Sequence, residues 1–316
     1  MSGLARRLLS ALGTVLLISV LVFLAIRLLP SDPARVILGP GAPEASLLVL
    51  REQLGLHLPL WQQYLQWLGA ALRGDLGLSL DSQVAVTQLL GQRFANSLAL
   101  LIPVALCNLL LAVGLGTLLA LYRDRWLDRL TLPLLVMFKS LPGFVLAIGL
   151  IMLFATSVFT WLPAVSLLDP ERSAFAQGRY LVLPVAALVL ASAPYLIRLV
   201  RAAMIEALHS DYVEAARLRG LQPWRLVFAH ALPNAVLPLI QGLALTLSVF
   251  FSSTLLVEMA FTYPGVGSLL NDAIRLRDVP VIQGGVSAIA AFVVGVNLLA
   301  DVLARLSVPR LRTLYL

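Results

Sequence analysis

The sequence predicts an all-α, polytopic membrane protein with six transmembrane helices. The 316-residue chain is 60% hydrophobic and only 12% charged, and its mean hydropathy of +0.93 exceeds that of soluble proteins. About 20 helical residues cross the hydrocarbon core of a bilayer, and six apolar stretches reach that length. The predicted spans cover about residues 8–29, 96–121, 132–158, 180–200, 236–257 and 281–303. We expect a single membrane domain over residues 1–316.

The first span resembles the apolar core of a secretory signal peptide. It follows Arg6 and Arg7, as such a core would. It is longer than an ordinary core, however, and it ends in RLLPSDPA rather than in a small-x-small cleavage site. We therefore interpret residues 8–29 as a retained membrane span.

The segment 30–93 is predicted to lie outside the membrane and to contain two helices. The stretch PEASLLVLREQLGL predicts a short helix between Pro43 and Gly55. The stretch PLWQQYLQWLGAALRG predicts a second, with Trp61, Leu65, Leu68 and Leu72 on one face and Tyr64 beside them. This amphipathic, aromatic helix is suited to the membrane interface. Docking of a receptor and packing on the outer ends of the spans are both open roles.

The later spans contain few features that interrupt an apolar helix. Lys139 lies near the inner end of the third span and is expected to extend its ammonium group to the interface. Pro142 and Pro194 are expected to kink their helices. After the fifth span, YPGVG predicts a turn and SLLNDAIRL a short amphipathic helix.

The distribution of arginine predicts the orientation of the chain. With both termini cytoplasmic, 13 arginines flank the inner ends of the spans and 4 lie in the short outer loops. The inner set is Arg6, Arg7, Arg123, Arg125, Arg129, Arg198, Arg201, Arg217, Arg219, Arg225, Arg305, Arg310 and Arg312, and the outer set is Arg172, Arg179, Arg275 and Arg277. This bias predicts a multi-pass protein of the bacterial cytoplasmic (inner) membrane with its N-terminus inside. The net charge of +7 therefore requires no nucleic acid partner.

The sequence lacks the motifs of an enzyme or of a self-powered pump. The single lysine, Lys139, follows no glycine-rich loop, which excludes a phosphate-binding loop. The three histidines are far apart in sequence, so we expect no metal site and no bound cofactor. The spans carry no acid except Asp301 at the border of the last one, which argues against ion-coupled transport. The energy for transport must then come from another protein.

A charged segment between the fourth and fifth spans is the most informative part of the sequence. It reads DYVEAARLRGLQPWRLVFAHALP and covers residues 211–233. Asp211 is expected to cap a helix, with Glu214 in capping-box register. Ala215 and Ala216 keep one side of this helix thin, and Gly220 is expected to end it.

A second helix is expected to follow this first one. It runs from Trp224 through Phe228 to Leu232 and Pro233, which lead into the fifth span. The two helices form an elbow that suits insertion into a groove of a partner protein. The alternative is a solvated loop whose charges only anchor the topology.

The same segment resembles the EAA loop of permeases in ABC importers. The family pattern is E-A-A, three residues, Gly, nine residues, Ile, one residue, Leu-Pro. Its matches are Glu214, Ala215, Ala216, Gly220, Leu232 and Pro233, and His230 takes the place of Ile. Other segments resemble the B-type permease subunit of the dipeptide, oligopeptide and nickel importers. They are RLLPSDPA, LREQLGLHLPLWQQYLQWLGAALRGDLGLSL, SLPGFVLAIGL, VEMAFTYPGVG and RDVPVIQGG, in the family's order.

The resemblance implies a type I ABC importer permease fold with a cytoplasmic coupling loop over residues 201–233. It implies a second, paralogous permease subunit, two ATPase subunits that bind ATP and Mg²⁺, and a periplasmic or lipid-anchored substrate-binding protein. The coupling residues would be Asp211, Glu214, Ala215, Ala216, Arg217, Gly220, Leu232 and Pro233. The implied solute is a di- or oligopeptide, with nickel or a metal chelate as the alternative. A self-contained channel or membrane enzyme is a more distant alternative.

Five residues near the outer end of the fifth span are candidates for the substrate path. They are Glu258, Pro264, Gly265, Gly267 and Asp278. Glu258 would meet a substrate amino group or a metal, or else anchor the helix at the interface. Asp278 would pair with a nearby arginine or meet the binding protein.

Overall fold

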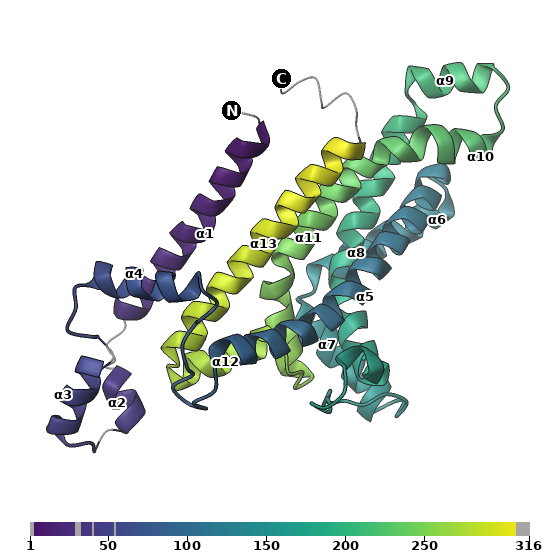
Figure 1. Ribbon diagram of the computed structural model, residues 1–316. Helices are drawn as coiled ribbons and strands as arrows, with labels where there is room; N and C mark the ends of the chain where they lie inside the picture. The colour runs from purple at the N-terminus through teal and green to yellow at the C-terminus, as the bar shows by residue number, and fades with distance from the viewer. Residues whose placement is uncertain (1–2, 29–32, 40, 54, 308–316) are drawn as a thin grey trace. The chain divides into compact units, whose positions relative to one another are not determined.

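The computed structural model describes residues 3–28, 33–39, 41–53 and 55–307 (Figure 1). Residues 29–32 of the motif RLLPSDPA lie outside these residues, as do Arg310 and Arg312. The described part of the chain is helical, and its only extended pairing is an isolated bridge between Leu78 and Ala85. The all-α prediction is confirmed.

The helices follow one another as the apolar pattern predicts. The first half of the chain holds α1 (Gly3–Leu28), α2 (Pro33–Leu38), α3 (Glu44–Gln53), α4 (Leu60–Ala71), α5 (Val86–Leu121), α6 (Trp126–Ser140) and α7 (Gly143–Ile151). A π-helical turn, η1 (Met152–Thr156), and a 3₁₀ turn, η2 (Ala174–Gln177), follow. The second half holds α8 (Gly178–Leu208), α9 (Asp211–Leu218), α10 (Pro223–Arg225), a π-helical segment η3 (Leu226–Ala231), α11 (Leu232–Ala260), α12 (Val266–Leu276) and α13 (Val279–Ser307).

Five helical stretches of the described chain are each long and apolar enough to cross a membrane. They are Arg6–Arg27, Val86–Leu121, Ala174–Leu208, Pro223–Ala260 and Val279–Ser307. The third predicted span, residues 132–158, is not a single helix. It falls on α6 and on α7 with η1, which are bent by 101° relative to each other and make a sixth span if the pair is counted as one.

The bend has a local cause at Pro142. This proline has φ −59° and ψ 143°, and the preceding Leu141 is also extended, with ψ 133°. Proline disfavours helical geometry in the residue before it, so α6 cannot continue through Leu141. Pro194, in contrast, lies inside α8 without interrupting it.

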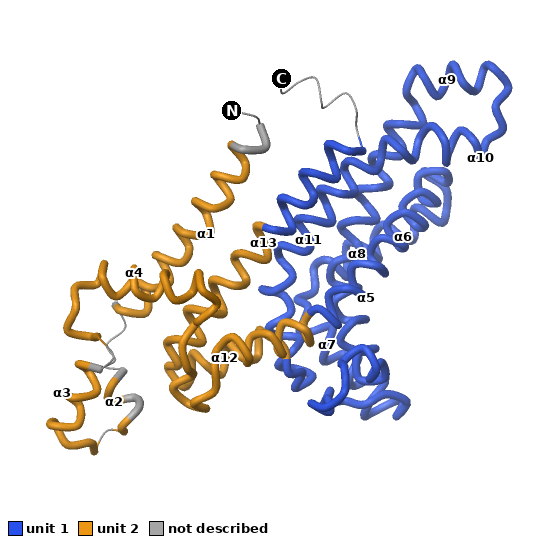
Figure 2. The backbone as a smooth tube through the Cα atoms, in the orientation of Figure 1, with its two compact units in different colours: residues 1–3, 98–264, 295–316 blue, residues 4–97, 265–294 orange. Residues whose placement is uncertain are grey.

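The chain divides into two compact units (Figure 2). Unit 1 comprises residues 1–3, 98–264 and 295–316, and α8 lies at its centre. Buried residues of α8 pack against α5, η3 and α11: the cluster is Ala112, Ala120, Leu196, Val200, Met204, Ala207, Val227, Ala231, Ala235 and Leu239. Two glycines allow this close packing. A Cβ on Gly116 would lie 2.9 Å from the Ile197 carbonyl oxygen, and one on Gly242 would lie 2.4 Å from Leu199 Cδ2.

Unit 2 comprises residues 4–97 and 265–294. Both helices predicted in the outer segment are present, as α3 and α4. Tyr64 of α4 packs edge-on against Phe23 of α1, with ring centroids 5.5 Å apart, and its hydroxyl lies 2.7 Å from Ser19 Oγ. Trp61 and Leu65 are exposed. The apolar face of α4 is therefore open at these positions, as expected for a helix at a membrane interface.

Candidate functional site

The charged segment between α8 and α11 forms the predicted helical elbow, which we define as residues 211–233. Figure 1 shows α9 and α10 projecting beyond the neighbouring ends of α6 and α8, all of which belong to unit 1. The predicted cap of α9 is wrong by one residue. Ser210 is the N-cap, with extended φ −76° and ψ 149°, and its carbonyl accepts hydrogen bonds from the Val213 and Glu214 amides. Asp211 and Glu214 instead lie in the first turn, where their negative charges interact favourably with the positive end of the helix dipole.

Gly220 ends α9 as predicted. It has φ +75°, in the left-handed region that glycine adopts without steric cost. Its amide donates to the Arg217 carbonyl at 3.0 Å, and the Leu221 amide donates to the Ala216 carbonyl at 3.4 Å. This pair of bonds is the Schellman motif, which reverses the chain after a helix.

The inner side of the elbow is a small apolar core. The first arm of the elbow is α9, and the second arm comprises α10 and η3. Val213 and Ala216 of α9 pack against Leu226 of the second arm, and Leu221 of the turn also contacts this core. The two alanines therefore differ. Ala216 is only 5% exposed and holds the two arms together, whereas Ala215 faces solvent. Only Ala215 keeps the thin, accessible surface that we expected of both.

The solvent-exposed side of α9 combines the apolar residue Leu218 with charged residues. Leu218 is 80% exposed, although its side chain is fully apolar. Arg217 Nη1 lies 2.9 Å from Glu214 Oε2, so these two predicted residues pair with each other. On the second arm, Trp224 and Phe228 are also more than half exposed. Such a surface of apolar groups beside charges is typical of a docking site.

The second arm joins α11 through a π-helical segment. Pro233 has no amide hydrogen to donate to a preceding carbonyl, and η3 ends directly before Leu232. π-Helical turns are rare and occur mostly inside α-helices, frequently at functional sites. Asn234 then donates its side-chain amide to the His230 carbonyl at 2.8 Å and to the Tyr212 hydroxyl at 2.6 Å. These bonds tie α9 to the start of α11.

A buried ion pair lies near the root of the elbow. Arg201 of α8 donates from Nε to Asp128 Oδ1 at 2.8 Å and from Nη2 to Asp128 Oδ2 at 2.6 Å. The side chains of Asp128 and Arg201 are 2% and 18% exposed. The Asp124 amide also donates to Asp128, at 3.0 Å. The sequence analysis missed this pair, because 73 residues separate its members and nothing in the local pattern connects them.

The five candidates for the substrate path fall in both compact units, Glu258 and Pro264 in unit 1 and Gly265, Gly267 and Asp278 in unit 2. Glu258 is completely buried in α11 of unit 1. Burial and the negative charge of Glu258 raise the pKa of nearby Tyr263, which therefore stays protonated. Pro264 belongs to the same unit, while Gly265, the N-cap of α12, and Gly267 in its first turn belong to unit 2.

Asp278 joins the turn over residues 79–82 to the start of α13 in unit 2. Its carboxylate accepts a hydrogen bond from Ser79 Oγ at 2.5 Å and lies 3.4 Å from the amides of Asp81 and Val281. Asp278 is 3% exposed. It thus fixes the 79–82 turn and the start of α13.

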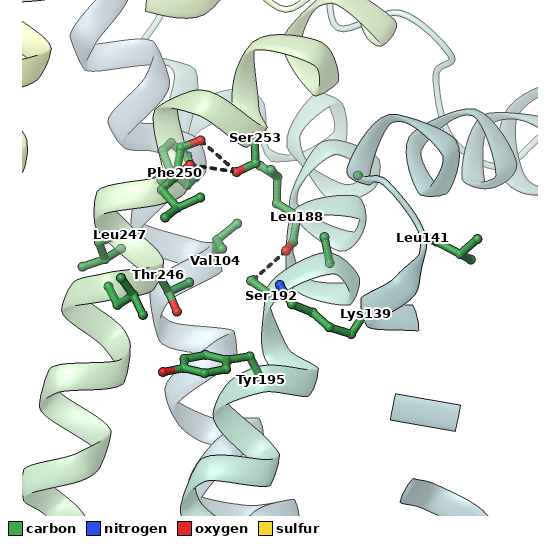
Figure 3. A pocket seen from close by; sticks show the side chains of 14 residues that line it. Val104, Lys139, Leu141, Leu188, Ser192, Tyr195, Thr246, Leu247, Phe250 and Ser253 are labelled. Atoms are coloured by element: carbon green, nitrogen blue, oxygen red, sulfur yellow. Dashed lines mark hydrogen bonds between the residues drawn. The ribbon is translucent and has the colours of Figure 1, made fainter. Parts of the chain in front are cut away.

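A cavity of about 300 Å³ lies in unit 1 between α5, the α6–α7 bend, α8 and α11 (Figure 3). Its walls are mainly apolar, and Lys139 is its only charged lining residue. The side chain of Lys139 extends toward Ser192. Lys139 was expected to extend its ammonium group to the membrane interface, and in the structure its side chain lines this cavity. Elsewhere, no three His, Cys, Asp or Glu side chains within the described ranges gather in a way that would hold a metal ion.

The sequence matches two protein families of one transport system. Residues 112–313 match the family described as binding-protein-dependent transport system inner membrane component. Residues 1–102 match the N-terminal family of the same membrane component.

Individual relatives extend over almost the whole chain. A glutathione transport system permease protein from Escherichia coli is 34% identical over 307 residues, which are 97% of each chain. A probable peptide ABC transporter permease protein from Sinorhizobium fredii is also 34% identical, over 97% of this chain and 98% of its own. Among solved structures, the MetNI methionine ABC transporter in an inward-facing conformation aligns with a TM-score of 0.55 and 18% identity. That alignment covers 70% of this chain and 97% of the other, and it supports the fold.

Proposed function

The chain belongs to the family of binding-protein-dependent transport system inner membrane components, and we propose that it imports peptides as the permease subunit of an ATP-driven transporter. The chain is a transport subunit of this family and not an enzyme. ATPase and substrate-binding partners are general to such importers.

The peptide substrate is supported by the relatives. Glutathione is itself a tripeptide, and the two permeases described above are named for glutathione and for peptides. Both are similar to this chain over nearly its full length. A small peptide is therefore the solute class that we propose.

The coupling mechanism is inferred from the exposed surface of the elbow. Its two arms are fixed to each other by their own core, with Val213 completely buried, and the second arm packs on α8 through Val227. Leu218 is nevertheless left exposed at the end of α9. An ATPase subunit with an apolar groove would cover Leu218 and pair with the charged rim of Glu214 and Arg217.

In this mechanism, the elbow transmits force as a nearly rigid body. ATP and Mg²⁺ bind to the partner ATPases, whose closure moves the seated elbow. Because η3 packs on α8, displacement of the elbow is passed to α8 and to the helices around it. ATP binding then biases the equilibrium between two arrangements of the spans, which requires that the ATPases bind the two arrangements with different affinity.

The assembly that we propose contains a second, paralogous permease, two ATPase subunits and a periplasmic or lipid-anchored binding protein. The elbow and both termini would lie in the cytoplasm, in agreement with the distribution of arginine. Segment 30–93 would face the binding protein.

Reconstitution of the complete complex in liposomes tests this function. We expect uptake of labelled trialanine or glutathione to require ATP, both ATPases and the binding protein. Empty liposomes and a complex with inactive ATPases are the controls. Uptake by this chain alone, without ATPases, would show that the chain is a self-contained channel.

A further inference from the structure

The cavity beside Lys139 has an unusual electrostatic character. Lys139 is the only lysine of the chain, and none of the 14 residues that line the cavity is acidic. A second cavity, of about 440 Å³, shares Lys139 and Tyr195 and adds Arg198 and Arg201 to its wall. Arg201 is paired with Asp128. No ion pair of Lys139 is found among the described residues, so its ammonium group supplies positive charge to both cavities.

The bend between α6 and α7 produces this arrangement. Lys139 lies in the last turn of α6, and after the break at Pro142 the next helix begins at Gly143, which also lines the cavity. The amino end of a helix carries partial positive charge and favours anions. The same bend therefore brings an ammonium group and a helix N-terminus to one cavity.

The hydroxyl groups of the cavity are largely committed to their own helices. Ser192 Oγ donates to the Leu188 carbonyl at 2.6 Å and accepts from Asn108 Nδ2 at 2.8 Å. Thr246 Oγ1 donates to the Gly242 carbonyl at 2.8 Å. Tyr195 differs, because its phenol forms no hydrogen bond with any described residue. Lys139 and Tyr195 are thus the two lining side chains that can donate to a ligand without breaking a bond already present.

We propose that Lys139 binds the carboxylate of the transported solute as it passes through the cavity, and that the Tyr195 phenol is a second hydrogen-bond donor to the same solute. This inference rests on the proposed function and gives the solute a required feature, a free carboxylate. A carboxylate is the ligand that an ammonium group favours, since charge-assisted hydrogen bonds are stronger than neutral ones.

The single lysine provides a direct test. The complete complex in detergent, without ATP, is treated with an amine-acetylating reagent, and acetylation of Lys139 is followed by mass spectrometry of this chain. The probes are trialanine and glutathione at millimolar concentration, each compared with its carboxamide. We expect the free acids to slow acetylation of Lys139 several-fold and the carboxamides to leave it unchanged. The α-amino group of the chain is the internal control.

Three outcomes would overturn the proposal. Equal effects of acid and carboxamide would show that the carboxylate is not bound. If Lys139 is not acetylated even in the absence of peptide, another subunit fills the cavity. Protection by added phosphatidylglycerol, with none by either peptide, would identify a lipid headgroup site.

Transport measurements separate this inference from the function itself. With wild-type complex and saturating binding protein, uptake of peptide establishes the function. Lys139→Met should then lower uptake of the free acid by about tenfold to a hundredfold, the value of a charge-assisted hydrogen bond. Lys139→Arg should retain part of it, and Arg129→Met, on the same helix but outside the cavity, should have no effect. Normal uptake by Lys139→Met would refute the carboxylate site and leave the function intact.

Discussion

The guanidinium of Arg201 donates two parallel hydrogen bonds, of 2.8 and 2.6 Å, to the carboxylate of Asp128. This pair joins α8 to α6 close to the base of the elbow. Both residues belong to the compact unit that carries α9. A bidentate pair fixes orientation as well as distance. We interpret it as the brace that keeps the end of α8 in place when the elbow is moved.

Loss of this brace should be costly. Asp128→Asn leaves the Arg201 charge buried without a full counter-charge, and breaking one partner of a buried pair costs roughly 3–5 kcal/mol. We expect a clear fall in the thermal unfolding temperature of the protein in detergent. Asp128→Leu combined with Arg201→Met should recover most of the loss, because neither charge then remains.

The exposed pair of α9 is the matched control for this prediction. The side chains of Glu214 and Arg217 are 52% and 55% exposed. Exposed pairs contribute about 0–1 kcal/mol, so Glu214→Gln should barely change the unfolding temperature. Equal shifts for Asp128→Asn and Glu214→Gln would contradict the structural role of the buried pair.

Gly220 should be replaceable only by a residue that tolerates a left-handed backbone. At φ +75°, a β-branched side chain is strained by about 1–2 kcal/mol, whereas asparagine enters this region more readily. We expect Gly220→Val to weaken binding of the ATPase subunits to the complex and Gly220→Asn to retain most of it, as measured by co-purification at graded salt. Open space around the Cβ position rules out a clash as the cause. Identical behaviour of the two variants would show that the turn does not depend on its backbone geometry.

A methyl group added at Gly116 should disturb the packing of α5 on α8, whereas one added at Gly114 should not. A Cβ on Gly116 would lie 2.9 Å from the Ile197 carbonyl oxygen, a backbone atom that cannot rotate away. Gly116→Ala should cost about 1–3 kcal/mol, the usual range for overpacking.

Gly114→Ala provides the comparison on the same helix. Nothing lies within 4 Å of its added Cβ, so this change should be neutral or slightly stabilising. Thermal unfolding in detergent measures both variants. If Gly116→Ala is as stable as Gly114→Ala, α5 and α8 are not in the close contact described.

The sequence predicted those features that depend on local pattern. Hydropathy located the apolar helices, and turn chemistry located Gly220 and the two short helices α3 and α4. The cap of α9 was placed on Asp211 instead of Ser210 because both residues are good caps and differ in position by one. Only the backbone geometry distinguishes them.

Features that depend on tertiary contacts were not predicted. The EAA motif predicted that both Ala215 and Ala216 lie on the thin, accessible side of the helix, yet Ala216 packs on Leu226 across the elbow. The pairing of Asp128 with Arg201 joins two helices far apart in sequence. The role of Lys139 at a cavity depends on the 101° bend, whose size no local propensity supplies.

Seating of Leu218 in an ATPase subunit is the central claim, and one binding measurement tests it most directly. The affinity of purified ATPase subunits for the reconstituted permease pair is compared between wild type, Leu218→Glu and Leu167→Glu. Leu167 is 69% exposed, similar to Leu218, but it lies in the segment between η1 and η2. We predict that Leu218→Glu weakens binding at least about thirtyfold, as for a buried anchor residue, while Leu167→Glu binds like wild type. Unchanged ATPase affinity of Leu218→Glu would contradict the account.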